Sequence, residues 1–173
     1  MMVLVPISNT DKAILEALRQ PLTEAFGQRI WVGDGIALTK GSRNQHRGQY
    51  LASMLLAELP SPPSLRDRVL GVVDVDIFAP GLNFVFGEAD ITGRRALISL
   101  QRLRQDFYGL PRDENLFQER ALKEAVHELG HTYGLKHCPN PTCVMHFSNC
   151  LRDTDLKGWN FCRTCHEKVN QKI

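Results

Sequence analysis

The sequence predicts a single domain of the mixed α/β class, and three observations lead to this fold class. Apolar runs rich in β-branched residues, such as VLVPI at residues 3–7, are typical of buried strands. Stretches with helical periodicity occur between these runs. The length of 173 residues suits one domain with at most a small appendage. We therefore expect one domain over residues 1–173, with a sheet-and-helix part at 1–134 and a small C-terminal part at 135–173.

A helix is predicted directly after the first strand. The segment TDKAILEALRQPLTEAF, residues 10–26, has apolar side chains at helical spacing, namely Ile14, Leu15, Leu18 and Leu22. Thr10 or Asp11 is suited to cap this helix, and Gly27 is suited to end it. Pro21 is expected to kink the helix or to divide it in two.

The next segments are predicted to be a strand, a helix and a loop. RIWVGDGIALTK, residues 29–40, indicates a second strand or a hairpin around its Gly-Asp-Gly turn. RGQYLASMLLAELP, residues 47–60, is predicted to be helical up to its final proline. SPPS, residues 61–64, is expected to be a loop.

Three strands and a long helix are predicted to follow. The strands are RVLGVVDVDIFA at 68–79, LNFVFGEAD at 82–90 and RALISLQRL at 95–103. Residues 107–114 form a connection to the helix ENLFQERALKEAVHELGHTYG, which covers 114–134 with Asp113 as its expected cap. After this helix the chain is rich in Cys, His, Pro and Asn and has little periodicity. Because this tail is short and polar, a metal ion is the expected source of its order.

The long helix carries the pattern HExxH, which is a specific signal for zinc. His127 and His131 are four residues apart, so they lie on one helical face and can hold one ion together. Leu122, Ala125, Val126 and Leu129 cluster on the side away from the histidines, which we expect to be buried. Glu128 is one step round the helix, where its carboxylate can reach a metal-bound water instead of the metal.

The pattern continues as HExxHxxGxxH, which adds Gly134 and His137. A glycine in the left-handed conformation can end the helix and turn the chain back, bringing His137 to the ion. Three imidazoles and a water give zinc one open position, as in catalytic sites. The alternatives are ordinary core or surface histidines, or a structural zinc. A structural zinc at the histidines would need a fourth protein ligand, and the tail supplies no obvious one.

Four of the five cysteines form a second pattern, Cys138-x4-Cys143 and Cys162-x2-Cys165. Four thiolates fill a tetrahedral zinc and leave no open position, so this site is predicted to be structural. A redox-active CxxC pair is the alternative. Cys150 could replace Cys143, but we expect it to be a free thiol.

The two predicted sites adjoin, because His137 and Cys138 are consecutive. Their Cα atoms are about 3.8 Å apart. A zinc ion whose four positions are all filled by protein ligands, Cys138 among them, would fix the backbone that directs His137. The hypothesis is therefore that the structural zinc orders the tail and completes the catalytic site.

Charge and hydropathy exclude several classes of partner. The formal net charge is +2, and residues 138–173 carry no basic stripe, so nucleic acid is not an expected partner. No apolar run approaches the roughly 20 residues of a membrane span. The start MMVLVPIS is too short for a signal peptide. A cytoplasmic location is therefore expected, with thiols that bind metal rather than form disulfides. The oligomeric state is open, and a monomer is favoured.

The combined signature resembles the archaemetzincins, small metzincin-like proteins of archaea and vertebrates that pair HExxHxxGxxH with a four-cysteine zinc site. The resemblance covers about residues 72–166, because DVDIFAPGLNFVFGEAD at 74–90 also looks like that family's segment before the helix. It implies that Met145 in CVMHF forms a Met-turn, an apolar floor beneath the histidines. An ordinary core methionine is the alternative.

The resemblance also implies a metzincin-like fold. This fold has a twisted mixed sheet over a backing helix and an active-site helix, followed by an irregular C-terminal part below the cleft. An antiparallel edge strand borders the cleft and pairs with extended peptide. LNFVFGEAD, residues 82–90, is the candidate for this strand, and an interior strand is the alternative.

The expected function is that of a zinc metallopeptidase acting on a peptide or protein substrate. Glu128 is expected to act as general base on a zinc-bound water, with two zinc ions per chain, one catalytic and one structural. The alternative is a non-catalytic, zinc-ordered module that binds peptide or protein without turnover. Tyr133 and His146 are near the motif but are assigned no part in stabilising the oxyanion.

Overall fold

The core of the fold is a mixed five-stranded sheet. In residues 1–172, which the computed structural model describes, its strand order is β2-β1-β5-β8-β7. The strands are β1 Met2–Ile7, β2 Ile30–Val32, β5 Arg68–Val73, β7 Gly87–Asp90 and β8 Arg95–Ser99. All neighbouring pairs are parallel except β7 with β8, which is antiparallel. The strand β7 therefore forms one edge of the sheet, as predicted.

A second, three-stranded sheet lies beside the first. Its strands are β3 Arg43–Asn44, β4 Gln49–Leu51 and β6 Ile77–Phe78, in the order β3-β4-β6. Short 3-10 turns, η1 Lys40–Ser42, η2 Gln101–Leu103 and η3 Gln105–Tyr108, lie in the connections.

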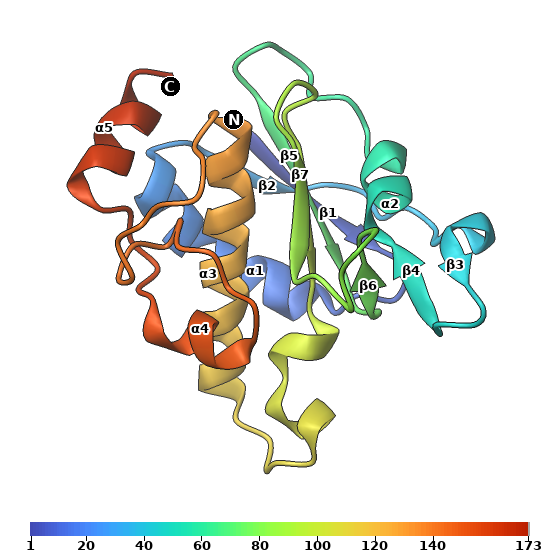
Figure 1. The fold of residues 1–173 in the computed structure, drawn as a ribbon. Coiled ribbons are helices and arrows are strands. Elements are labelled where there is room, and N and C mark those ends of the chain that lie inside the picture. The colour runs from blue at the N-terminus through green and yellow to red at the C-terminus, as the bar shows by residue number, and fades with distance from the viewer. Residues whose placement is uncertain (173) are drawn as a thin grey trace.

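Helices cover both faces of the large sheet (Figure 1). Helices α1 Lys12–Phe26 and α3 Glu114–Thr132 pack on one face, and α2 Ala52–Glu58 packs on the other. Every residue of β5 is buried, because this central strand has helices on both sides. Two hydrophobic clusters fill the two interfaces, one around α1 and α3 and the other around α2.

The C-terminal part packs against the outer side of α3. It contains two short helices, α4 Leu151–Leu156 and α5 Arg163–Asn170, so it is less irregular than predicted. Its residues Val144, Met145, Cys165 and Val169 are buried in the same cluster as α1 and α3. That residues 1–173 form one domain, divided at residue 134, stays a prediction.

The fold class is as predicted, but several elements differ in extent. Asp11 caps α1, whose N-terminal Ala13 N–H donates to the Asp11 carboxylate, and α1 continues as one helix through Pro21. Residues 29–40 form no hairpin: β2 pairs with β1 in parallel, and Ile36 makes one further bridge to Ile7. The helix predicted over 47–60 is shorter, because Gln49–Leu51 join the small sheet as β4.

The two strands predicted before β8 are also shorter. The segment 68–79 divides into β5 and β6, which belong to different sheets. In the segment 82–90 only Gly87–Asp90 is a strand. No helix in residues 1–172 has the length and apolar character that crossing a bilayer requires, and the cytoplasmic location stays a prediction.

Candidate active site and metal centres

The helix α3 places the first three motif residues at one end of a cleft. Asp113 caps the helix as predicted, accepting the Leu116 N–H at 3.0 Å. The apolar face of the helix is buried through Ala125, Val126 and Leu129, so His127 and Glu128 face the sheet edge and the cleft. Both of these polar residues are themselves buried, at 4% and 7% exposure.

The end of α3 turns the chain back toward the histidines. Gly134 has φ +79°, a conformation that costs a residue with a side chain more than it costs glycine. Leu135 N–H donates to Gly130 O at 3.2 Å, and Gly134 N–H donates to His131 O at 2.8 Å. These two bonds form a Schellman cap, which closes the helix. The chain then reverses and brings His137 beside the helix, as predicted.

The three histidines converge on one point. Their ligand atoms all lie within 4.8 Å of one another. The Nε2 atoms of His127 and His131 are 3.1 Å apart. Two nitrogens in a tetrahedral zinc site, each 2.0–2.1 Å from the ion, would be about 3.3 Å apart. The arrangement of the imidazoles therefore fits zinc.

Backbone carbonyls fix how the first two imidazoles are turned. His127 Nδ1–H donates to Val144 O at 2.8 Å, and His131 Nδ1–H donates to Leu135 O at 2.7 Å. Each bond leaves the Nε2 lone pair free for a metal. Burial lowers the pKa of His127, His131 and His137, and that of His127 most strongly. The imidazoles are therefore neutral, which is the form that binds metal.

Glu128 lies directly against the edge strand β7. A Cβ atom placed on Gly87 would be 2.5 Å from Glu128 Cγ and 2.8 Å from its Oε1, so only glycine leaves room for this carboxylate. Burial raises the pKa of Glu128 well above its usual value, and the nearby carboxylates Glu124 and Glu88 raise it further. The ammonium of Lys157 opposes this effect.

A cleft of about 470 Å³ contains the histidines and Glu128. Its lining includes residues 82–87, Ala89 and Ile91 from the sheet edge and the loop before it, and residues 147–149 from the C-terminal part. Much of the lining is apolar, and includes Leu82, Phe84, Val85, Phe86, Ile91 and Phe147. The site thus has room for an extended chain beside the convergent imidazoles.

The four predicted cysteines form a second cluster. The sulfur atoms of Cys138, Cys143, Cys162 and Cys165 all lie within 4.8 Å of one another. Cys138 Sγ and Cys162 Sγ are 3.8 Å apart, and four sulfurs placed 2.3 Å from a tetrahedral zinc would be separated by about 3.8 Å. Burial raises the pKa of the Cys143 and Cys165 thiols, so a cation is needed to hold them as thiolates at neutral pH. This donor set also fits zinc.

Comparison with known proteins assigns the chain to a family. Residues 25–171 match the model described as Peptidase family M54. This chain belongs to peptidase family M54. The resemblance to archaemetzincins is thereby confirmed, as is the prediction of a zinc metallopeptidase.

Two relatives of the M54 chain are archaemetzincins from archaea. The one from Methanocaldococcus jannaschii is 46% identical over 167 residues, covering 96% of this chain and 91% of the relative. The one from Pyrococcus furiosus is 43% identical over 183 residues, covering 100% of this chain and 94% of the relative.

Two solved structures are also similar to the structure of this M54 chain. The archaemetzincin of Archaeoglobus fulgidus, complexed with malonate, superposes with a TM-score of 0.85 at 39% identity and covers 97% of this chain and 99% of that one. A zinc-dependent peptidase from Methanocorpusculum labreanum gives a TM-score of 0.88 at 27% identity, covering 98% of this chain and 100% of that one. The predicted mixed α/β, metzincin-like fold class is therefore confirmed.

The remaining predicted residues of the M54 chain have distinct places. Met145 is fully buried, and its Sδ packs so closely on Gly130 of α3 that a Cβ placed there would be 2.5 Å away. Cys150 is exposed and lies outside the cysteine cluster. Tyr133 is buried against Phe26, with ring centroids 5.4 Å apart, and does not line the cleft.

Sequence reasoning missed residues that shape the M54 site. Gly87 is one, because its role depends on the approach of Glu128 from another element. Glu124 and Lys157 are two more, and they form a buried ion pair at the cleft, whose lining includes Glu124. The position of Glu124 one helical turn before Glu128 was the available signal for the first member of this pair.

Proposed function

We propose that this chain hydrolyses peptide bonds in its cleft, with His127, His131 and His137 holding a zinc ion and Glu128 acting as general base. The observation that carries the proposal is the convergence of three neutral imidazoles beside one buried carboxylate. When bound, zinc acidifies a water molecule and polarises the substrate carbonyl. Proton transfer and substrate binding are assigned to the side chains and backbone of the protein.

Glu128 is suited to receive the proton of the attacking water and to return it to the leaving amine. Burial raises the pKa of this carboxyl group, and a carboxylate with a raised pKa is a stronger base. Its contact with Gly87 fixes the carboxylate between the histidines and the strand β7. A base held in this way needs no rearrangement before it acts.

The strand β7 is suited to bind an extended peptide by backbone pairing. Ser99 N–H donates to Phe86 O at 2.8 Å, and Gly87 is opposite Ile98 in the register. In an antiparallel pair the hydrogen-bonding direction alternates, so Gly87 and Ala89 point their backbone groups away from β8, toward the open edge. Both residues line the cleft. A substrate strand added here would pass close to Glu128.

The lining of the cleft favours uncharged side chains in the substrate. Phe84, Ile91 and Phe147 offer apolar contact, while Asn83, Ser148 and Asn149 are polar but neutral. Glu124 and Glu128 also line the cleft, so an anionic substrate side chain would lose hydration without gaining an ion pair, and a cationic one would have to compete with Lys157 for Glu124. We therefore propose preferred cleavage beside apolar residues.

The second zinc is proposed to be structural. Cys138, Cys143, Cys162 and Cys165 provide four ligands, which leaves no position for water or substrate. The proposal thus assigns two zinc ions to each chain and chemistry to the histidine site alone. Met145 is proposed as the apolar Met-turn floor beneath α3.

The test compares the wild type with Glu128→Gln on a diverse peptide library. The expected loss is about 10²–10⁴ in kcat, with fold and zinc content retained, because the amide cannot accept the proton. Glu119→Gln is the matched control, since Glu119 is on the same helix but half exposed and outside the cleft. Peptide cleavage that survives unchanged in Glu128→Gln would refute the proposal. Peptide binding without any cleavage by the wild type would favour the non-catalytic module instead.

A further inference from the structure

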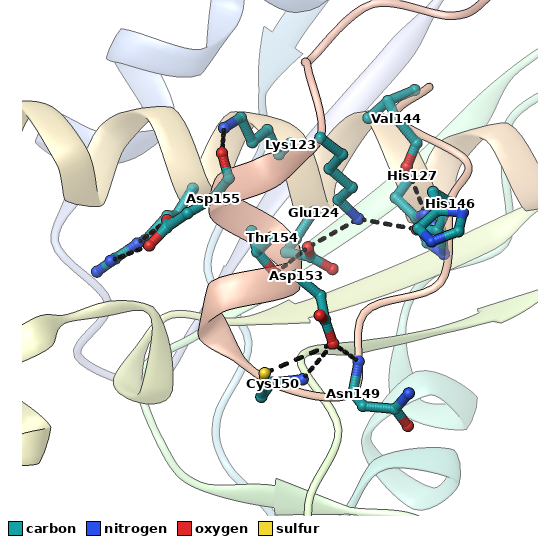
Figure 2. A network of polar contacts seen from close by, with 12 residues as sticks. Lys123, Glu124, His127, Val144, His146, Asn149, Cys150, Asp153, Thr154 and Asp155 are labelled. Carbon is teal, nitrogen blue, oxygen red and sulfur yellow. Dashed lines mark hydrogen bonds and ion pairs between the residues drawn. The ribbon is translucent and has the colours of Figure 1, made fainter. Parts of the chain in front are cut away.

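A buried ion pair lies at the cleft, whose lining includes one of its members, Glu124. Lys157 Nζ is 3.1 Å from Glu124 Oε1, and the two side chains are 0% and 4% exposed. Thr154 Oγ1 donates to the same carboxylate oxygen at 3.1 Å, and Lys157 Nζ also donates to His146 O at 3.4 Å. Figure 2 shows this network, in which Glu124 of α3, Thr154 of α4 and the loop residue His146 meet. The pair thus joins two helices and the loop 143–146.

Other contacts besides this pair attach α4 to α3. Arg120 holds the Asp155 carboxylate through two hydrogen bonds of 2.6 and 2.7 Å. Lys123 pairs with Glu119 at 2.7 Å and reaches Asp155 O at 3.4 Å (Figure 2). Buried ion pairs are also weak contributors to stability, since apolar replacements are often as stable. What Lys157 adds is its contact with the loop.

The loop 143–146 orients ligands of the proposed catalytic site. Val144 O accepts the hydrogen bond from His127 Nδ1 at 2.8 Å. Met145 O accepts from Cys138 N at 2.9 Å, next to His137, and the His146 ring bonds to Cys138 O at 2.9 Å. Movement of this loop would therefore turn His127 and shift His137 together.

We propose that Lys157 is a positioning residue that clamps the loop 143–146 onto Glu124 of α3, and so keeps His127 Nε2 directed at the metal site. The inference rests on the proposed function for the identity of that site. Loss of such an outer partner of a ligating histidine typically weakens metal binding by about 10–100-fold. The docking of α4 has other contacts besides the clamp, whereas Cys143 of the thiolate cluster belongs to the clamped loop itself.

The experiment measures zinc affinity of the full chain by competition with a fluorescent chelator, which separates the histidine site from the thiolate site. Lys157→Met leaves the buried Glu124 carboxylate without its ion-pair partner, so this single variant is compared together with the double variant Glu124→Gln, Lys157→Met. The double variant removes both charges and keeps the acceptor for Thr154. Lys123→Met is the matched control, since Lys123 is also a buried, paired lysine that reaches α4.

If Lys157 positions the loop in this way, the double variant should melt near the wild-type temperature. It should nevertheless bind zinc at the histidine site about 10–100-fold more weakly. Its thiolate site should lose less affinity than its histidine site, because four thiolates enclose that ion, and the Lys123→Met protein should bind zinc as the wild type does. Wild-type affinity at the histidine site of the double variant would overturn the inference, because the pair would then act on stability alone. Equal weakening in Lys123→Met would overturn it as well.

The measurement contains no peptide, so it is independent of peptidase activity. A wild type that cleaves no peptide would refute the proposed function and leave the zinc affinities to decide on the clamp. A wild type that cleaves peptides, combined with unchanged affinity in the double variant, would refute the clamp alone.

Discussion

At the scale of single residues, the site depends on the absence of a side chain at Gly87 as well as on the side chains of the motif. Glu128 can approach the strand β7 only because Gly87 has no Cβ. The same glycine presents its backbone groups at the open edge of the sheet, where a peptide would pair. Base and substrate strand therefore meet at one position.

Gly87→Ala is expected to displace Glu128. The added methyl would lie 2.5 Å from Glu128 Cγ and 2.6 Å from Leu97 O, so both the base and the sheet edge must shift. Because a misplacement of about 1 Å can cost roughly 10²-fold, kcat should fall by about that factor while zinc remains bound. Steady-state kinetics, zinc content and thermal melts would be measured together. Gly41→Ala is the control, since nothing lies within 4 Å of its added Cβ. Undiminished kcat in Gly87→Ala would mean that Glu128 tolerates the shift or is not the base.

At the scale of elements, the end of α3 decides whether the third histidine reaches the site. The Schellman cap at Gly134 reverses the chain within a few residues, so that His137 returns to the face that carries His127 and His131. The loop 143–146 then supports this arrangement from the other side through Val144 O and Met145 O. One helix and one loop thus fix three ligands.

Gly134→Ala is expected to weaken zinc binding at the histidine site. The left-handed conformation costs a residue with a Cβ about 1–2 kcal/mol, so the free energy of unfolding should fall by about that amount and the turn should relax. Gly109→Ala is a matched control, because Gly109 has φ +77° and an open environment but lies away from the histidines. Chemical denaturation and zinc competition would be run on both variants. A similar stability loss in both with unchanged zinc affinity in Gly134→Ala would show that His137 finds its place without the cap.

At the scale of the whole molecule, two donor clusters with different coordination meet at consecutive residues. His137 belongs to the open cluster and Cys138 to the closed one. The C-terminal part also contributes Val144, Met145, Cys165 and Val169 to the core shared with α1 and α3. Order in the cysteine cluster is therefore expected to be transmitted to the histidine cluster through the backbone.

Protein purified without chelator is expected to contain two zinc ions per chain, of which a mild chelator removes the histidine-bound ion first. The open site exchanges its water, whereas four thiolates enclose the other ion. Zinc would be counted by atomic absorption during chelator titration. Loss of both ions at one chelator concentration would contradict the division into open and closed sites.

Cys162→Ser is expected to lower both the melting temperature and the zinc affinity of the histidine site, and to destabilise the chain more than His127→Ala. The reason is that structural zinc binding stabilises small zinc-dependent folds by roughly 10–16 kcal/mol, whereas the apolar face of α3 is buried with or without metal. Cys150→Ser is the control, since Cys150 is exposed and outside the cluster. Unchanged affinity at the histidine site in Cys162→Ser would show that the two sites are independent.

Features that depend on local geometry could be predicted from the sequence alone. The spacing of His127, Glu128 and His131 is meaningful because a helix repeats every 3.6 residues, and the cap at Asp113 and the turn at Gly134 are equally local. The pairing of the cysteines into one group of four was also within reach, because their count and spacing match one tetrahedral ion.

Contacts between distant segments, in contrast, could be found only in the folded chain. Residues 82–86 have the apolar character of a strand, yet Arg47 donates to the carbonyls of Leu82 and Asn83, so these groups have a partner outside any strand ladder. The segment 68–79 divides at residues 74–76, where Asp76 pairs with Arg102 from another part of the chain. Gly87 beside Glu128 and Lys157 beside Glu124 are likewise contacts between separate elements. Periodicity along the chain reports how each segment folds on itself, whereas such contacts arise when all segments bury their apolar surface together.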